Sequence, residues 1–178
     1  MKVKVRLAKE KDLPVFFNFF EHCIGKNFPE YSLMTRKYIV EEGYSFNKFG
    51  KGIKTGGIEI FLAFSGKKVV GFLFAKLQFG GVAWGDWFAV KKEYQRQGIA
   101  SLLLKAWEKR AFQDGAHKLE FFTDNRNLNF YQERGFVLVG MIPDSYFGAD
   151  DYLFYKTLRK SDEKKFLKDY LKEEKKIK

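Results

Sequence analysis

One short stretch, Gln95-Arg96-Gln97-Gly98-Ile99-Ala100, lies between a segment with strand character and a segment with helix character. The preceding residues, 82–90, are mostly aromatic and apolar, with Asp86 as their only charge. After the stretch, apolar residues such as Leu103 and Trp107 recur at the spacing of an amphipathic helix. The sequence therefore predicts a strand, a tight turn and a helix, in that order.

The turn at the start of this helix predicts an anion-binding site. The first backbone N–H groups of a helix have no partner within the helix, and the helix dipole favours negative charge there. Gly98 has no Cβ to keep a ligand off the backbone, and the small Ala100 keeps the first turn open. We therefore expect a cradle for a phosphate or pyrophosphate, with Arg96 at its rim. The alternative interpretation is that Gly98 only makes a connecting turn.

The commonest phosphate-binding motifs of nucleotide-binding folds are missing from the sequence. It contains neither Gly-x-x-x-x-Gly-Lys-Ser/Thr, which nucleotide hydrolases use, nor Gly-x-Gly-x-x-Gly, which dinucleotide-binding folds use. The predicted cradle therefore matches neither of these two classes of phosphate-binding loop.

Two motifs resemble the signatures of the GNAT N-acetyltransferase family. The pattern Gln95-x-x-Gly98-x-Ala100, which follows a strand and opens an amphipathic helix, resembles the acetyl-CoA loop of that family. Further on, Phe130-Tyr131-Gln132-Glu133-Arg134-Gly135-Phe136 resembles the second signature, a short helix that carries a Tyr and ends in Gly-Phe. The resemblance covers roughly residues 57–158. It implies acetyl-CoA as co-substrate and a primary amine, on a protein or a small molecule, as the acetyl acceptor.

The chain as a whole is predicted to form an α/β (α+β) domain. Apolar patterning predicts strands at residues 2–7, 58–64, 69–79, 82–90, 119–123, 137–142 and 152–158. It predicts helices at 12–25 with Asp12 as cap, at 32–42, after Gly98 and around Tyr131, and a Gly-rich link at 50–57. The resemblance implies a GNAT-like, mostly antiparallel sheet of six to seven strands, with helices on both faces and a splayed central strand pair.

The two parts of the chain are predicted to have different roles. Residues 1–158 would form the acetyltransferase domain. Residues 159–178 carry an acidic start and an apolar stripe, which predicts an amphipathic helix that docks on the domain or forms a homodimer contact.

Asp86 is the first candidate for the general base, and Glu59 is the second. Large aromatic neighbours would resist ionisation of Asp86 and raise its pKa, so that it can accept a proton near neutral pH. An alkyl amine is mostly protonated at neutrality and attacks a thioester only after it loses a proton. The alternative for Asp86 is a structural pair with a neighbouring Lys or with backbone donors, and the alternative for Glu59 is exposure to solvent.

The resemblance also assigns the coenzyme contacts and the general acid. The backbone near a bulge or splay at 88–90 would bind the pantetheine chain and polarise the thioester carbonyl. Tyr131 would protonate the departing thiolate, or else simply pack with its hydroxyl hydrogen-bonded. The full set of expected coenzyme-binding residues is Phe88, Ala89, Val90, Gln95, Arg96, Gln97, Gly98, Ile99, Ala100, Ser101 and Asn125. The sequence departs from the common family pattern around Tyr131, which weakens the transfer of a coenzyme-binding Asn to either Asn125 or Asn127.

Composition excludes several other classes of protein. Cys23 is the only cysteine, so no disulfide can form within the chain, and we expect a small buried side chain in a reducing cytoplasm. The adjacent His22 has no further ligands at zinc-like spacing, so we expect no metal site. No apolar run reaches the length of a membrane span, so we expect no membrane partner.

The net charge of +11 favours the binding of polyanions but does not identify which polyanion binds. The excess is mostly Lys and is scattered, and phosphate neutralisation by such a surface carries no sequence information. We expect a field that helps to gather the polyanionic coenzyme, and no specific nucleic-acid partner. A basic nucleic-acid binder and a non-catalytic acetyl-CoA-binding module are the alternative functions.

Two regions are candidates for the acceptor pocket. The resemblance implies that the segment between the first two strands shapes it, and this segment contains the aromatic residues Phe28, Tyr31, Tyr44, Phe46 and Phe49. Such a cluster is either a lid or a local core. The loop 143–151 is acidic and aromatic, so it either attracts a cationic amine or is simply solvated. A protein N-terminus, a lysine side chain, a polyamine and an antibiotic-like amine all stay open as acceptors.

Overall fold

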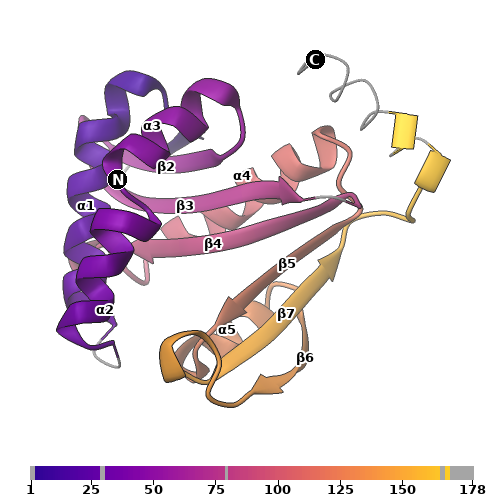
Figure 1. Ribbon diagram of the computed structural model, residues 1–178. Coiled ribbons are helices and arrows are strands. Elements are labelled where there is room, and N and C mark those ends of the chain that lie inside the picture. The colour runs from indigo at the N-terminus through magenta and orange to yellow at the C-terminus, as the bar shows by residue number, and fades with distance from the viewer. Residues whose placement is uncertain (1–2, 29–30, 79, 165–166, 169–178) are drawn as a thin grey trace.

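The computed structural model describes residues 3–28, 31–78, 80–164 and 167–168, and these form one sheet with helices on both faces (Figure 1). The sheet has seven strands: β1 (Val3–Leu7), β2 (Glu59–Ser65), β3 (Lys68–Gln78), β4 (Val82–Val90), β5 (Lys118–Thr123), β6 (Val137–Ile142) and β7 (Asp151–Thr157). The helices are α1 (Leu13–Asn27), α2 (Leu33–Tyr38), α3 (Phe46–Thr55), α4 (Ile99–Gln113) and α5 (Leu128–Gln132). The predicted mixed α/β class is confirmed.

The sheet is antiparallel except at its centre. Its spatial order is β1-β2-β3-β4-β5-β7-β6, and only β4 and β5 run parallel. Parallel neighbours need a crossover connection, and α4 provides it. The turn that was predicted to bind an anion therefore lies at the beginning of this crossover, beside the centre of the sheet.

Two apolar cores hold the helices against opposite faces of the sheet. On one face, Phe16 and Phe20 of α1 and Phe49 of α3 pack with Phe72 of β3, largely in edge-to-face ring contacts. On the other face, the core contains Leu103 and Trp107 of α4, Tyr131 of α5, and Phe121 and Phe154 of the sheet. Figure 1 shows strands β2 to β4 diverging from the half of the sheet formed by β5, β7 and β6.

The region between β1 and β2 is more helical than predicted. Residues 50–55 of the predicted Gly-rich link belong to α3, because the helix buries Phe49 and because Gly52 lets Ile58 pack closely against it. A Cβ at Gly52 would lie 2.5 Å from Ile58 Cγ1. The predicted helix at 32–42 ends as α2 at Tyr38 and continues as a wider π-type turn. Packing here outweighs the low helix propensity of glycine.

Asp12 is the N-cap residue of α1, as predicted, but its side chain does not make the capping hydrogen bond to the helix. Its buried carboxylate instead accepts hydrogen bonds from Arg6 Nη1 at 2.7 Å, Arg6 Nη2 at 2.9 Å and the Lys9 N–H at 2.8 Å. The Arg6 guanidinium holds the pKa of Asp12 below its usual range. The pair fixes β1 to the start of α1.

Three other expectations concern the remainder of the chain. Cys23 is buried as predicted, and burial raises the pKa of its thiol to about 12, so it is an inert core residue. None of the helices in the described part of the chain has the length and apolarity that a membrane crossing requires. The predicted terminal helix falls mostly outside the described residues.

Candidate active site

The candidate site begins where β4 separates from β5. The two strands pair only from Val82–Gly85 on β4 with the opposing residues of β5, and the remainder of β4 keeps β3 as its sole sheet neighbour. The predicted splay of the central pair is therefore confirmed. It exposes one edge of β4 from Asp86 to Val90.

A bulge on β4 marks the point of separation. Phe74 of β3 pairs with Trp87, whereas the next residue, Ala75, pairs with Gly85, so Asp86 is the extra residue on β4. The sequence placed the bulge or splay near 88–90, and the bulge itself lies two residues earlier. Gly85 lets Trp107 of α4 approach the strand, since a Cβ there would lie 3.0 Å from the indole ring. The contact with α4 at Gly85 and the bulge at Asp86 therefore lie next to each other on β4.

The exposed edge of β4 presents backbone donors. The Lys91 N–H donates to the Val70 carbonyl of β3 at 2.9 Å. Because successive residues of a strand alternate in direction, the N–H groups of Phe88 and Val90 face away from β3 and toward the gap. The Val90 carbonyl also faces this side, where it accepts a hydrogen bond from Gln95 Nε2 at 3.0 Å.

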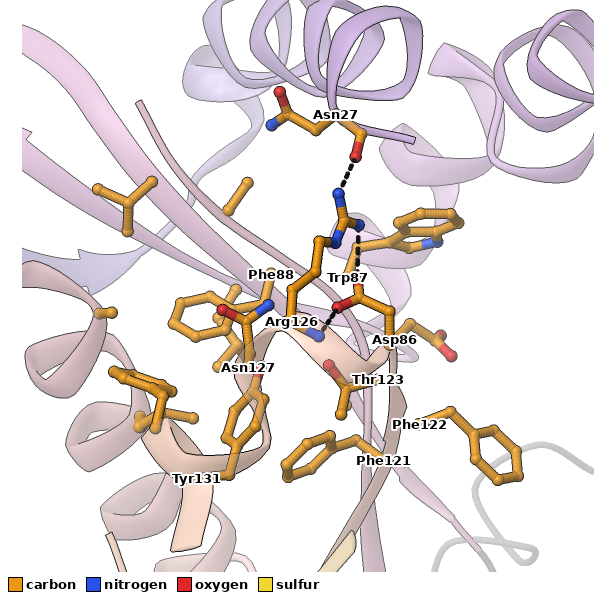
Figure 2. A pocket seen from close by; sticks show the side chains of 18 of the residues that line it. Asn27, Asp86, Trp87, Phe88, Phe121, Phe122, Thr123, Arg126, Asn127 and Tyr131 are labelled. Carbon is orange, nitrogen blue, oxygen red and sulfur yellow. Dashed lines mark hydrogen bonds and ion pairs between the residues drawn. The ribbon is translucent and has the colours of Figure 1, made fainter. Parts of the chain in front are cut away.

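A single cavity of about 1560 Å³ runs through this gap. Most ligand pockets of proteins measure about 300 to 1,000 Å³, so this one is large enough for an extended ligand with a second molecule beside it. Its walls come from β4, the start of α4, β5, α5, the end of α1 and the loop before β7. Figure 2 shows Asp86 of β4, Thr123 of β5 and Tyr131 of α5 around the same space.

The turn before α4 has the open form that the sequence predicted. Gly98 caps the helix at φ 78°, a left-handed conformation that favours glycine, and nothing lies within 4 Å of where its Cβ would be. Gln95, Arg96, Gly98, Ile99, Ala100 and Ser101 line the cavity. Gln97 does not, and its side chain donates to the Glu93 carbonyl at 3.2 Å. The first turn of α4 therefore opens onto the cavity.

Asp86 lies in the cavity with its side chain 8% exposed. Its Oδ2 is 3.1 Å from Lys76 Nζ, yet within the described residues that oxygen has no hydrogen bond of good geometry. Burial raises the pKa of Asp86, and the Lys76 ammonium offsets part of that rise. The structure thus combines the two alternatives for this residue, a desolvated carboxylate and an ion pair with a neighbouring lysine.

Glu59, the second candidate base, does not line the cavity. Its Oε1 accepts a hydrogen bond from Arg110 Nε at 2.6 Å, and Arg110 also pairs with Asp114, just after the end of α4. Burial raises the pKa of Glu59 and the guanidinium lowers it in part. The geometry gives Glu59 the role of fixing β2 to α4, away from the site.

Tyr131 is buried between the cavity and the core. It lines the cavity from α5 and contacts the rings of Phe121 and Phe154, with centroids 4.5 Å and 5.6 Å away. Burial raises the pKa of the phenol, and a hydrogen bond with the Thr123 side chain offsets part of that rise. The raised pKa keeps the Tyr131 phenol protonated near neutral pH and makes it a weaker acid than an exposed tyrosine.

The two asparagines after β5 differ in position. Asn125 is exposed and does not line the cavity, whereas Asn127 does. Figure 2 shows Asn127 in the same close-up as Tyr131. The local turn was predicted, because Asp124 Oδ1 accepts the Arg126 N–H at 2.8 Å as expected of a cap-forming residue. Which asparagine faces inward depends on the tertiary fold.

Sequence reasoning missed two arginines of the cavity. Arg134 Nε donates to Ser101 Oγ at 2.9 Å, its Nη1 donates to the Phe130 carbonyl at 2.6 Å, and its guanidinium stacks 3.8 Å from the Phe130 ring centre. This fixes a positive charge beside the α4 cradle. Arg126 donates to the Asn27 carbonyl at 3.2 Å and so connects the turn after β5 to the end of α1 (Figure 2). Arg134 could have been identified from the sequence, because it lies within the second motif, between Tyr131 and Gly135.

Comparison with known proteins supports the fold and the family. The Acetyltransferase (GNAT) family matches residues 26–136. No curated protein sequence gives a significant match. Among solved structures, PaiA N-acetyltransferase from Thermoplasma acidophilum in complex with coenzyme A is 21% identical with a TM-score of 0.73, covering 88% of this chain and 99% of that chain.

Two further structures show the same likeness. Ard1 from Thermoplasma volcanium is 17% identical with a TM-score of 0.69, over 90% of this chain and 100% of that chain. The ribosomal-protein-S18-alanine N-acetyltransferase from Escherichia coli is 17% identical with a TM-score of 0.67, over 91% and 97%. At these identities the structures establish the fold alone. Because the family match spans well over half of the sequence, the chain belongs to the GNAT acetyltransferase family.

Proposed function

We propose that the protein transfers the acetyl group of acetyl-CoA directly to a primary amine. One observation carries this proposal: the free edge of β4, the open first turn of α4 and the buried carboxylate of Asp86 all face one cavity. An extended thioester can therefore reach an anion cradle at one end and a proton acceptor at the other. The coenzyme A bound to the Thermoplasma acidophilum PaiA N-acetyltransferase, which has the same fold, supports this choice of donor.

The chain supplies binding groups along the whole donor. The N–H groups around Gly98 and Ala100 would hold the diphosphate, with Arg134 supplying a positive charge beside them. The N–H groups of Phe88 and Val90 would bind the pantetheine chain and stabilise negative charge on the thioester oxygen during attack. These contacts come from the backbone, so the side chains at 88–90 matter less than the splay itself.

The reaction needs one proton acceptor and one proton donor. Asp86 would take a proton from the ammonium form of the acceptor, directly or through water, and the free amine nitrogen would attack the thioester carbonyl carbon. The carbon–sulfur bond then breaks and the thiolate leaves with the bond's electron pair. The amide nitrogen would lose its remaining extra proton to solvent. Tyr131 would protonate the departing sulfur and take up a proton from solvent in turn. No covalent enzyme intermediate is required, and Cys23 is buried in the core away from the cavity.

The decisive experiment combines donor binding with turnover. Calorimetry should detect acetyl-CoA binding, and thiol release should be measured with acetyl-CoA and a panel of amines. We expect acetyl-CoA binding and amine-dependent thiol release. Binding without transfer to any amine would show a non-catalytic coenzyme-binding protein, and the lack of both heat and thermal shift at millimolar acetyl-CoA would refute the whole proposal.

A further inference from the structure

A row of four aromatic rings connects β4 with the turn before β7. Trp87 contacts Phe28 with centroids 5.2 Å apart, Phe28 stacks on Tyr31 at 5.6 Å, and Tyr31 contacts Phe147 at 5.7 Å. All four residues line the cavity. The row therefore forms a continuous wall from the neighbour of Asp86 to the short turn Tyr146–Gly148.

A second row of three rings runs between the same two places. Trp84 contacts Phe122 of β5 with centroids 5.1 Å apart, and Phe122 contacts Tyr146 at 5.9 Å. These residues also line the cavity. The two rows start on β4 on either side of Asp86 and end on adjacent residues of one turn. In the view of Figure 2, Trp87 and Phe122 lie on opposite sides of Asp86.

Carboxylates mark both ends of the two rows. Asp86 lies between their beginnings, and Asp150 and Asp151 line the cavity just after the turn where they end. Asp150 Oδ1 accepts the Asp144 N–H at 3.2 Å, and Asp151 Oδ2 accepts the Tyr146 N–H at 3.4 Å. In the described part of the chain, neither carboxylate pairs with a lysine or arginine. This negative charge occurs in a chain whose net charge is +11.

The turn itself connects the two sides of the cavity. Phe147 has φ 58°, a left-handed conformation that is unfavourable for a phenylalanine. This conformation holds its ring against Tyr31 and also 6.3 Å from the Tyr38 ring of α2. Strain of this kind persists where the surrounding contacts require it. The contact joins the β7 side of the cavity to the α1–α2 side.

On the basis of the proposed function, we propose that the acceptor is a small linear aliphatic amine that carries a second positive charge. The reacting amine lies at Asp86, the aliphatic chain lies between the two aromatic rows, and the second ammonium lies at Asp150 and Asp151. Aromatic faces attract ammonium groups and cover methylene chains, and unpaired carboxylates attract the remaining charge. A polypeptide terminus has neither the slender chain nor the second charge at its end.

The test compares amines that differ only in the second charge. With saturating acetyl-CoA, kcat/KM is measured for three diamines, 1,3-diaminopropane, 1,4-diaminobutane and 1,6-diaminohexane. Each is compared with the monoamine of the same chain length, propylamine, butylamine or hexylamine. A tetrapeptide with a free N-terminus is measured in the same way. We expect at least one diamine to exceed its monoamine by tenfold or more, mainly through a lower KM, and to exceed the peptide. This preference should shrink as salt rises from 50 to about 500 mM, because it is coulombic.

A double variant, Asp150→Asn with Asp151→Asn, tests the second binding point. The diamine-to-monoamine ratio should fall to about one, while acetyl-CoA binding by calorimetry shows that the fold persists. Asp144→Asn is the matched control, since Asp144 belongs to the same loop and does not line the cavity, and it should keep the ratio. Acetylation of monoamines or of the peptide as fast as diamines would overturn this inference and leave the proposed function standing. Failure of every amine would overturn both.

Discussion

The Asp86 side chain is largely removed from water, with Lys76 Nζ 3.1 Å from one oxygen. Burial raises its pKa, so the carboxylate form that accepts a proton is lost at a higher pH than for an exposed aspartate. Activity should therefore fall as pH decreases through this raised pKa. We expect Asp86→Asn to lower kcat by about 10²-fold or more and to remove this acid limb of the pH–rate profile.

Glu59→Gln is the matched control for that prediction. Glu59 is also a partly buried carboxylate with a raised pKa, but it pairs with Arg110 outside the cavity. Its replacement should lower thermal stability and leave kcat and the pH–rate profile unchanged. A larger loss of kcat in Glu59→Gln than in Asp86→Asn would reverse the assignment of the base.

The phenol of Tyr131 gives a second prediction at this scale. Tyr131→Phe removes the proton donor and keeps the ring contacts with Phe121 and Phe154. We expect kcat to fall by about 10²-fold, since a positioned acid typically contributes this much, while the Kd for acetyl-CoA changes little. Stopped-flow measurement of thiol release separates this step from product release. An unchanged rate would assign Tyr131 to packing alone.

Arg134 gives a third prediction, on coenzyme affinity. Its contacts with Ser101 and the Phe130 carbonyl hold the guanidinium beside the cradle, where it would contact a phosphate. Because a hydrogen bond to a charged group contributes about 1.5 to 3 kcal/mol, Arg134→Met should raise the Kd for acetyl-CoA at least about tenfold. Arg159→Met is the control, because Arg159 stacks on Phe112 at the same 3.8 Å but does not line the cavity. Calorimetry that shows equal losses in both variants would contradict the phosphate contact.

Among the structural elements, the turn into α4 combines a left-handed backbone conformation that glycine adopts readily with an open surface. Gly98→Ala places a Cβ at φ 78° in the space where the diphosphate would lie. The backbone cost is about 1 kcal/mol, which should lower Tm by about 2 to 4 °C, and acetyl-CoA affinity should fall further. Gly56→Ala measures the backbone cost alone. Gly56 has φ 70° and an equally open Cβ position, but it does not line the cavity. Equal coenzyme affinity in the two variants would show that the turn does not bind the diphosphate.

The same turn shows what sequence can predict about an element. Gly98 and the amphipathic spacing after it are local features, and they were enough to predict the strand, the turn and the helix. The bulge at Asp86 was placed too late, because its position depends on how Trp107 packs against Gly85. The helix α3 was missed, because burial of Phe49 and the Gly52–Ile58 contact stabilise it through residues outside the helix.

Candidate site residues could be predicted from the sequence where neighbouring residues in one strand or one motif identify them. Asp86 and Tyr131 were identified from their neighbours and their motif, and both line the cavity. The choice between Asn125 and Asn127 was not predictable, since a turn with caps can present either side chain to the cavity. The two aromatic rows could not be predicted from the sequence either. Their residues come from β4, β5, the end of α1 and the turn before β7, which lie together only in the folded chain.

For the whole molecule, the main consequence is that the cavity lies between two halves of one sheet. The direct pairing of the halves is confined to Val82–Gly85 of β4, and the two cores lie on opposite faces. A bound coenzyme would contact both halves, through β4 and α4 on one side and α5 on the other. Its binding energy would therefore add to the stability of the junction.

Hydrogen exchange followed by mass spectrometry tests this arrangement directly. Without acetyl-CoA, the amides of Phe88 and Val90 should exchange faster than those of the neighbouring β4 residues that pair with β3. With saturating acetyl-CoA, we expect slower exchange at residues 86–90, at 95–101 and at 123–134, and no change in α3. The Gly98→Ala variant at the same coenzyme concentration should show much weaker protection in all three regions. Protection confined to one half of the sheet would mean that the coenzyme does not bridge the gap, and Phe88 and Val90 would then lose their assigned part in holding the thioester.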